Sequence, residues 1–251
     1  MNTDGSEETQ MRQVDLNCDV GEGVGSDAAI MRWITSANIA CGAHAGDVKT
    51  MRETVNLARE FGVAVGAHPG FTDRANFGRK EWVLSAGEIE RLVTEQVEAL
   101  GEIAEVRHVK PHGALYNIAA REARVAEAIA RAVRALDERL VLFGLAWSEL
   151  VRAGRACGLR VVEEVFADRR YRADGTLVPR SEAGAMIDNE EEAAEQVLRM
   201  VNDGEVCAVE GGRVTIVADT ICLHGDGAHA VEFAQRIRTE LERAGVKVAA
   251  V

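Results

Sequence analysis

Hydrophobic and polar residues alternate in a recurring order along this chain of 251 residues. Short apolar or alternating runs, typical of strands, are followed by runs in which apolar residues recur every three or four positions, as on one face of a helix. The pattern predicts strands at 14–20, 36–41, 63–68, 106–112, 140–145, 160–166 and 215–224. It predicts longer helices at 47–61, 85–101, 119–137 and 227–244, and shorter ones at 27–34, 147–157 and 189–202.

Seven units of strand and helix follow one another without a linker, which predicts one α/β domain with a mostly parallel sheet. We expect residues 1–12 to form a flexible N-terminal tail and residues 13–251 to form the domain. Two architectures fit this order of elements. One is an open sheet covered by helices on both faces, and the other is a closed or nearly closed (β/α) barrel.

The strand at 14–20 favours the barrel, because only one of its faces is apolar. Asp15, Asn17 and Asp19 point to one face, and apolar residues occupy the alternate positions. Strands of an open parallel sheet are apolar on both faces, whereas barrel strands meet helices only on the outside. The segments HVKPH and TICLH show the same division, with polar faces formed by His108, Lys110, His112, Thr220, Cys222 and His224. We therefore predict a seven-stranded, distorted barrel with a polar interior.

Residues 167–188 interrupt the alternation of strands and helices. The segment is polar, carries an Asp-Gly turn signal and shows little periodicity. So long a connection is usually a lid, a binding loop or disorder. Its position after the sixth strand predicts that it lies at the catalytic rim of the barrel.

The charge and the cysteine content exclude several classes of protein. The net charge is −12, with no block of Lys or Arg, which disfavours partners such as nucleic acid and anionic membranes. The N-terminus lacks the features of a signal peptide, and no apolar run approaches bilayer length. Five cysteines, an odd number without paired spacing, indicate reduced thiols and a cytoplasmic protein.

Histidines gather at the predicted strand ends. The ends of barrel strands converge on one mouth, so we expect four of these side chains to share a site: His44, His68, His112 and His224. His108 begins its strand, far from that mouth, and is expected to be structural. His229 falls in the first turn of the last predicted helix, where a surface position is expected.

Acidic residues accompany these histidines. Asp19 has the fewest structural alternatives, since it ends a polar face just before a tight glycine turn. Asp47 and Asp226 are suited to cap the helices that follow them. Asp15 is suited to anchor a backbone amide inside the barrel. Glu22 and Asp168 also follow predicted strands, at the same end of the barrel.

Two chemistries remain open for imidazoles and carboxylates at one mouth. They can bind a divalent metal that activates water, or they can act without metal as acid and base on a hydrolysable bond. No HExxH or HxH motif decides between these two. Lys110, Arg169 and Arg170 add cations suited to a carboxylate or phosphoryl oxygen, although the two arginines could simply be solvated. Neither GEGVG nor GAHAGDVKT has the spacing of a nucleotide-binding motif.

Six motifs in order resemble the LamB/YcsF family, whose members are the A subunits of 5-oxoprolinase, over about residues 13–248. They are VDLNCDVGEGVG, SANIACGAHAGD, GAHPGFTDRANFGRK, HVKPHGALYN, EVFADRRYRADGTLVPR and ICLHGD. The resemblance implies a barrel akin to the glycoside hydrolase/deacetylase superfamily. It also implies ATP-dependent opening of 5-oxoproline to glutamate, carried out with the partner subunits B and C. Since the chain has no nucleotide motif, another subunit is expected to handle ATP.

The motifs and the strand ends together give a predicted site. Its catalytic set is Asp19, His44, His68, His112 and His224. Its substrate-binding set is Asn17, Glu22, Asn38, Lys110, Asp168 and Arg169. Whether a divalent metal is bound stays open. The alternatives are a metal-dependent deacetylase or amidohydrolase acting on another small amide or carbohydrate, and a regulatory subunit that binds a metabolite without catalysis.

Overall fold

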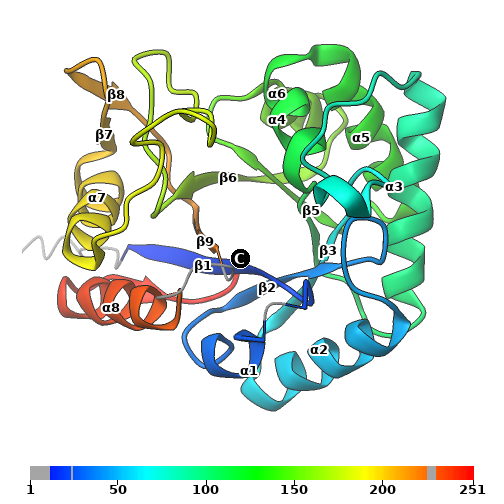
Figure 1. Ribbon diagram of the computed structural model, residues 1–251, viewed down its shortest axis with the longest axis horizontal. Coiled ribbons are helices and arrows are strands. Elements are labelled where there is room, and N and C mark those ends of the chain that lie inside the picture. Colours follow the sequence, from blue (N-terminus) through cyan, green and yellow to red (C-terminus); the bar gives the residue numbers. More distant parts are fainter. Residues whose placement is uncertain (1–11, 24, 225–229) are drawn as a thin grey trace, which may run out of the picture.

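Seven parallel strands close into a barrel in the computed structural model, which describes residues 12–23, 25–224 and 230–251 (Figure 1). The strands are β1 (Gln13–Val20), β2 (Ser36–Ala40), β3 (Ala64–His68), β4 (His108–Val109), β5 (Val141–Leu145), β6 (Arg160–Phe166) and β9 (Thr220–His224). Each pairs with the next, and β9 pairs with both β6 and β1, which closes the ring. The predicted seven-stranded barrel is confirmed.

Helices surround the barrel and cover its outer face (Figure 1). They are α1 (Asp27–Ile30), α2 (Val48–Phe61), α3 (Ala86–Gly101), α4 (Gly113–Arg121), α5 (Ala123–Leu136), α6 (Glu149–Ala156), α7 (Glu190–Asp203) and α8 (Ala230–Arg243). The smaller elements are a 3-10 turn (Arg74–Asn76), β7 (Glu205–Cys207), β8 (Arg213–Thr215) and β10 (Lys247–Val248). Among the described residues, no helix has the length and apolar character that a membrane crossing requires.

Four predicted elements differ from the structure, three of them as follows. The helix expected at 119–137 is two helices, because the backbone at Glu122 is extended, with φ −115° and ψ 107°. The helix expected at 27–34 ends at Ile30. The strand expected at 215–224 is divided: only β9 joins the barrel, and β8 pairs with β7 in an antiparallel hairpin that the sequence pattern missed.

The strand predicted at 106–112 is also shorter, since β4 ends at Val109. Pro111 has no N–H to donate to a neighbouring strand, so regular pairing stops before it. The N–H groups of Lys110 and His112 still donate to carbonyl oxygens in or just after β3. The segment therefore keeps its course along the barrel wall although it is not a regular strand.

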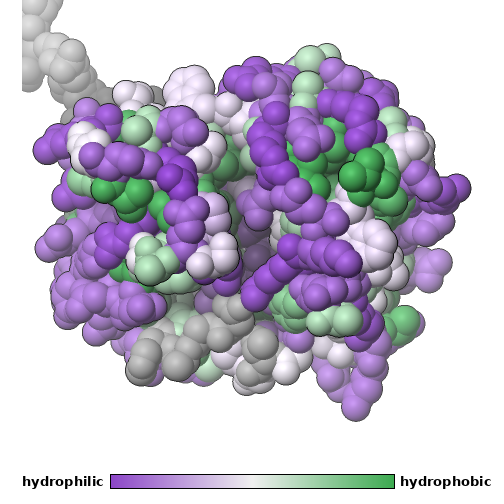
Figure 2. Space-filling view, turned by 45° about the horizontal axis from the view of Figure 1, so that its top comes forward, coloured by the Kyte–Doolittle hydropathy of each residue, from purple (hydrophilic) through white to green (hydrophobic). Residues whose placement is uncertain are grey.

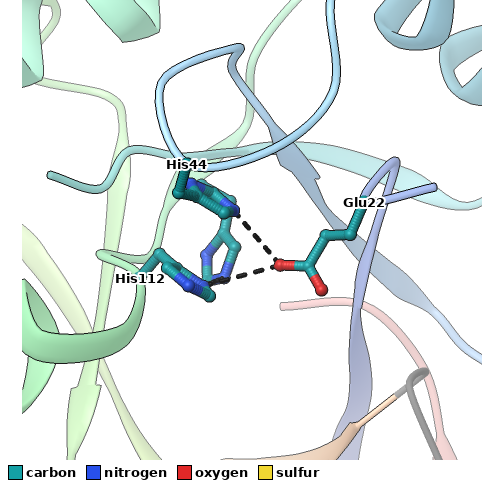
Figure 3. Close-up of side chains that lie close together, drawn as sticks. Glu22, His44 and His112 are labelled. Atoms are coloured by element: carbon teal, nitrogen blue, oxygen red, sulfur yellow. Dashed lines mark hydrogen bonds and ion pairs between the residues drawn. The ribbon is translucent and has the colours of Figure 1, made fainter. Parts of the chain in front are cut away.

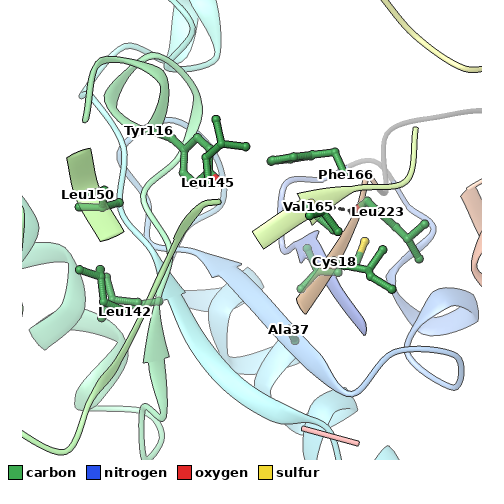
Figure 4. Packing of buried hydrophobic residues seen from close by; sticks show 14 of the residues in the cluster. Cys18, Ala37, Tyr116, Leu142, Leu145, Leu150, Val165, Phe166 and Leu223 are labelled. Atoms are coloured by element: carbon green, nitrogen blue, oxygen red, sulfur yellow. Dashed lines mark hydrogen bonds between the residues drawn. The ribbon is translucent and has the colours of Figure 1, made fainter. Parts of the chain in front are cut away.

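Apolar residues of the strands face the helices. Cys18, Val165 and Leu223 come from β1, β6 and β9 and pack together in the main hydrophobic core, and Leu142 of β5 faces Leu150 of α6 (Figure 4). Removal of these side chains from water supplies most of the stabilisation. The opposite faces of the same strands are thereby left to line the barrel interior.

The interior is polar even at its base. Asp15 accepts hydrogen bonds from the hydroxyls of Thr35, Ser36 and Thr220 at 2.6–2.7 Å. Asp15 is therefore buried as expected, but it anchors hydroxyl groups of adjoining strands rather than a backbone amide. Val141, Phe143 and Val162 form a small apolar cluster of their own, separate from the main core.

Helix caps fix where the chain enters the outer layer. The Asp47 carboxylate accepts from the N–H of Thr50 at 2.8 Å, which confirms the cap expected for α2.

Asp226 and His229 lie outside the described residues, so their predicted positions stay untested. The predicted tail is outside them too, except for Arg12, which donates to carbonyl oxygens at the end of α7.

The segment 167–188 is a folded loop at the C-terminal end of the barrel (Figure 1). Short bridges join Arg169 to Met186 and Tyr171 to Leu177. Tyr171 is fully buried, and its hydroxyl accepts from the N–H of Phe166 at 2.7 Å. These contacts hold the loop against the end of β6, at the rim where it was expected.

Gly66 provides a test of interior packing, because a Cβ at this position would lie 2.0 Å from Nε2 of His108. We expect Gly66→Ala to lower the free energy of unfolding by about 1–3 kcal/mol, since the buried imidazole must move. Gly87→Ala is the matched control, since a Cβ there meets nothing within 4 Å and alanine favours a helix. Denaturant unfolding of both variants measures the difference, and equal stabilities would contradict this account of the packing.

Candidate active site

A pocket of about 910 Å³ opens at the C-terminal ends of the barrel strands. Figure 2 shows a hollow in this face, bordered mainly by hydrophilic residues. Seven of the predicted site residues line the pocket: Asp19, Glu22, His68, Lys110, His112, Arg169 and His224. The loop at 172–181 contributes part of its wall.

The Lys110 ammonium lies at the centre of the polar interior and is almost fully buried. Its Nζ has four partners: Asp19 Oδ1 at 2.9 Å, Glu164 Oε1 at 2.9 Å, Cys222 Sγ at 3.0 Å and Asn17 Oδ1 at 3.2 Å. The prediction that this lysine binds substrate stays a prediction: Lys110 lines the pocket, and its charge faces side chains of the barrel.

These contacts hold Asp19 as a carboxylate. Burial alone raises its pKa, but the neighbouring His68 and Lys110 outweigh burial and lower the pKa well below the usual value. Burial lowers the pKa of Lys110, and the facing Asp19, Cys222 and Glu164 raise it well above the usual value. The Asp19 carboxylate and the Lys110 ammonium thus both stay charged although the site is largely desolvated.

Glu164 is a site residue that the sequence analysis missed. It is fully buried, pairs with Lys110, and accepts from the Asn17 amide at 2.9 Å and from the Tyr116 hydroxyl at 2.6 Å. Alternation in RVVEEVF could have revealed it, because Glu164 shares a face with Phe166, which lines the pocket.

Two asparagines support Asp19 from below. Asn38 Nδ2 donates to Asn17 Oδ1 at 2.7 Å and to Asp19 Oδ1 at 2.9 Å. His108 Nε2 lies 2.8 Å from Asn38 Oδ1, and its ring stacks on Phe143 at 4.3 Å between centroids. Both asparagines were predicted to bind substrate, but neither lines the pocket. His108 lies below the mouth, in the layer where a structural role was expected.

Three histidines and Glu22 gather on one side of the pocket (Figure 3). Glu22 Oε1 lies 3.2 Å from His44 Nε2 and 3.5 Å from His112 Nδ1. His112 Nδ1 is 2.9 Å from His68 Nε2, and the rings of His44 and His112 stack at 3.7 Å between centroids. Gly78, whose φ is 62°, lets the backbone pass close to both stacked rings, since a Cβ there would lie 2.9 Å from the Cβ of His44.

Burial, and secondarily the neighbouring His68, lowers the pKa of two of these imidazoles. The pKa of His44 is about 3 and that of His112 is about 2. Both rings are therefore neutral at neutral pH, and each has a nitrogen lone pair available. His44 lies just behind the pocket wall, whereas His68 and His112 reach it.

Asp168 and His224 form a second pair across the pocket. Both carboxylate oxygens of Asp168 lie within 2.9 Å of His224 Nδ1, so this nitrogen donates. Burial raises the pKa of Asp168, but His224 and nearby arginines lower it overall. Arg169 is buried beside them and donates to the carbonyl of Val178 at 2.6 Å, whereas Arg170 pairs with Glu192 instead.

Two groups of described residues have the composition and spacing to hold a metal ion. One consists of Glu22, His44, His68 and His112, and the other of Asp19, Cys222 and His224. In each group the ligand atoms lie within 4.8 Å of one another. Asp19 belongs to the second group and is 3.2 Å from His68 of the first, so it connects the two sides of the site.

Fold and site together define a (β/α) barrel protein with an acid and imidazole pocket at the C-terminal mouth. The model of the LamB/YcsF family matches residues 14–251, and the chain belongs to this family. The 5-oxoprolinase A subunit of Bacillus subtilis (strain 168) is 51% identical over 251 residues, covering 96% of this chain and 98% of the relative. The 5-oxoprolinase A subunit of Tolumonas auensis is 53% identical, and the match covers 96% of this chain and 100% of the relative.

Solved structures agree with this membership. The lactam utilization protein from Thermus thermophilus has a TM-score of 0.89 and 45% identity, covering 95% of this chain and 100% of that one. The peptidoglycan deacetylase PdaC from Bacillus subtilis has a TM-score of 0.52 and 13% identity, and the match covers 96% of this chain and 89% of PdaC. The second likeness concerns the fold alone, and it agrees with the expected barrel fold.

Lys110→Met tests the central ion pairs. The change leaves Asp19 and Glu164 buried without their shared cation, so we expect the free energy of unfolding to fall by about 3–5 kcal/mol. Lys49→Met is the control, because Lys49 is 82% exposed and its pair with Glu53 lies on the surface. Thermal and denaturant unfolding report both, and a Lys110 variant as stable as the control would contradict the assignment.

Proposed function

We propose that this chain is the subunit of an ATP-dependent 5-oxoprolinase that opens the lactam ring of 5-oxo-L-proline to give L-glutamate. It would thus act as a hydrolase on a cyclic amide. Relatives more than 50% identical over nearly their full length are named as the A subunit of 5-oxoprolinase. The observation that carries the proposal is Asp19, held ionised beside His68 at the base of a pocket of about 910 Å³.

ATP and the partner subunits B and C belong to the proposal. A five-membered lactam resists hydrolysis at neutral pH, and phosphorylation of its oxygen would make the ring carbon electrophilic. The sequence has no nucleotide-binding motif, which supports a division of labour: a partner handles ATP and this chain opens the activated ring. The cytoplasm is the proposed compartment, in keeping with five free cysteine thiols.

Asp19 is assigned as the base that directs water to the ring carbon, because it is charged and lines the pocket. The acid toward the ring nitrogen is assigned to His224, whose imidazole is oriented by Asp168 across the pocket. His112 is less suited to that role, since its pKa of about 2 leaves it neutral. His68 contacts Asp19 directly and completes the base side of the site.

The remaining predicted residues have supporting roles in the proposal. Arg169, which lines the pocket, is assigned to the anionic group of the substrate. Lys110 keeps Asp19 ionised, while Asn17 and Asn38 fix its orientation. The likeness to a peptidoglycan deacetylase concerns the fold and does not extend that activity to this chain.

Glutamate formation tests the function directly. Purified chain is incubated with 5-oxoproline and ATP, alone and with its companion subunits, and glutamate and ADP are measured. We expect both products only with the companions present, because this chain lacks a nucleotide motif. ATP hydrolysis by this chain alone would refute the division of labour. No glutamate with every subunit present would refute the function.

Asp19→Asn tests the assigned base. The amide is isosteric but cannot accept a proton, so we expect glutamate formation by the reconstituted complex to fall at least ~100-fold. Asp137→Asn, on an exposed loop before β5, is the control and should leave the rate unchanged. Circular dichroism checks that both variants fold, and near-normal turnover of the Asp19 variant would remove it from the mechanism.

A further inference from the structure

Two main-chain carbonyls fix the protonation of neighbouring imidazoles in the group Glu22, His44, His68 and His112. His68 Nδ1 lies 2.7 Å from the carbonyl oxygen of Lys110, and His112 Nε2 lies 2.9 Å from that of Phe77. A carbonyl oxygen only accepts, so both nitrogens carry a proton and donate it. In a neutral imidazole the other ring nitrogen then holds a lone pair.

Those two lone-pair nitrogens face each other. His68 Nε2 and His112 Nδ1 are 2.9 Å apart, and Glu22 Oε1 lies 3.5 Å from His112 Nδ1. His68 and His112 are 1% and 5% exposed, so water has little access to separate them. Electron-rich atoms this close repel each other in a desolvated place. Asp19 Oδ2 also lies 3.2 Å from His68 Nε2. A positive charge at the point where these atoms meet, either a proton on His68 Nε2 or a metal ion in its place, removes the repulsion.

His44 supplies a fourth donor atom. Its Nε2 lies 3.2 Å from Glu22 Oε1, and the four candidate ligand atoms lie within 4.8 Å of one another. Its buried Nδ1 has no hydrogen-bond partner among the residues that the structure describes. No hydrogen bond from a described residue to that nitrogen therefore holds the ring in its stack on His112.

We propose that Glu22, His44, His68 and His112 bind one divalent transition-metal ion of the Zn²⁺ or Co²⁺ type. Three imidazoles and one carboxylate match the ligands that these ions take, whereas Mg²⁺ and Ca²⁺ prefer sites built from oxygen. The two carbonyls are the outer acceptors that metal-binding imidazoles usually have. Four successive strands of the barrel, β1 to β4, present one ligand each at or just after their ends.

The proposed ion borders the pocket, because Glu22, His68 and His112 all line it. Asp19 lies beside the ion site, 3.2 Å from His68 Nε2, and is not one of the four ligands. The inference concerns ion binding and holds whichever substrate occupies the pocket. Its failure is therefore distinguishable from failure of the proposed activity.

Titration of the full chain with Co²⁺, after removal of metal by a chelator, tests the site. We expect one ion per chain by elemental analysis, with the visible absorption bands of Co²⁺ bound to nitrogen ligands. His112→Gln and Glu22→Gln each remove a ligand and should weaken Co²⁺ binding at least ~100-fold. This loss of affinity exceeds the one caused by changing a residue that only hydrogen-bonds to a ligand. His224→Gln is the matched control and should bind as tightly as the unaltered chain, because His224 belongs to the other group.

Circular dichroism and the melting temperature without metal show whether each variant folds. If His112→Gln does not fold, the test rests on Glu22→Gln. Absence of stoichiometric binding would overturn the proposal. So would full affinity in a folded Glu22 or His112 variant. Loss of binding in His224→Gln alone would place the ion between Asp19, Cys222 and His224 and would likewise overturn it.

Discussion

The buried ammonium of Lys110 between Asp19 and Glu164 is the interaction on which the rest of the barrel interior depends. Two carboxylates from β1 and β6 would repel each other without it, and their separate burial would be costly. The amides of Asn17 and Asn38 donate to the same two oxygens that the lysine contacts, Glu164 Oε1 and Asp19 Oδ1. The polar interior is thus one connected network, closed at the base by the hydroxyls around Asp15.

This network determines which groups are available to a ligand. Lys110 is engaged by side chains of the barrel although it lines the pocket, and neither asparagine lines it, whereas Asp19, His68, His112 and His224 do. Burial keeps His44 and His112 neutral, whereas Asp168 orients His224 on the opposite side. The pocket therefore has two unlike walls: one suits a cation held by nitrogen lone pairs, and the other suits proton donation.

Family membership and the pocket support the same general chemistry from independent directions. The matched family model covers nearly the whole chain, and the relatives align over nearly their full length. The pocket, in turn, has a charged carboxylate on one side and, across the cavity, an imidazole oriented by Asp168. A cation beside Asp19 would add positive charge at this wall, and the base and the ion would then occupy neighbouring positions in one mouth.

The sequence by itself determined the barrel and the positions that face its interior. The period-two alternation in β1 and β9 predicted a polar inner face because side-chain direction in a strand depends only on local geometry. It did not reveal Glu164 as a partner of Lys110, because 54 positions separate them and only the rolled-up sheet directs the side chains of β6 and of the segment after β4 into one interior. The alternation in HVKPH placed Lys110 on the inner face, but tertiary structure alone decided that it meets two acids there. It alone decided that His68 Nε2 and His112 Nδ1 face each other, since main-chain carbonyls from other segments hold the opposite nitrogens of both rings.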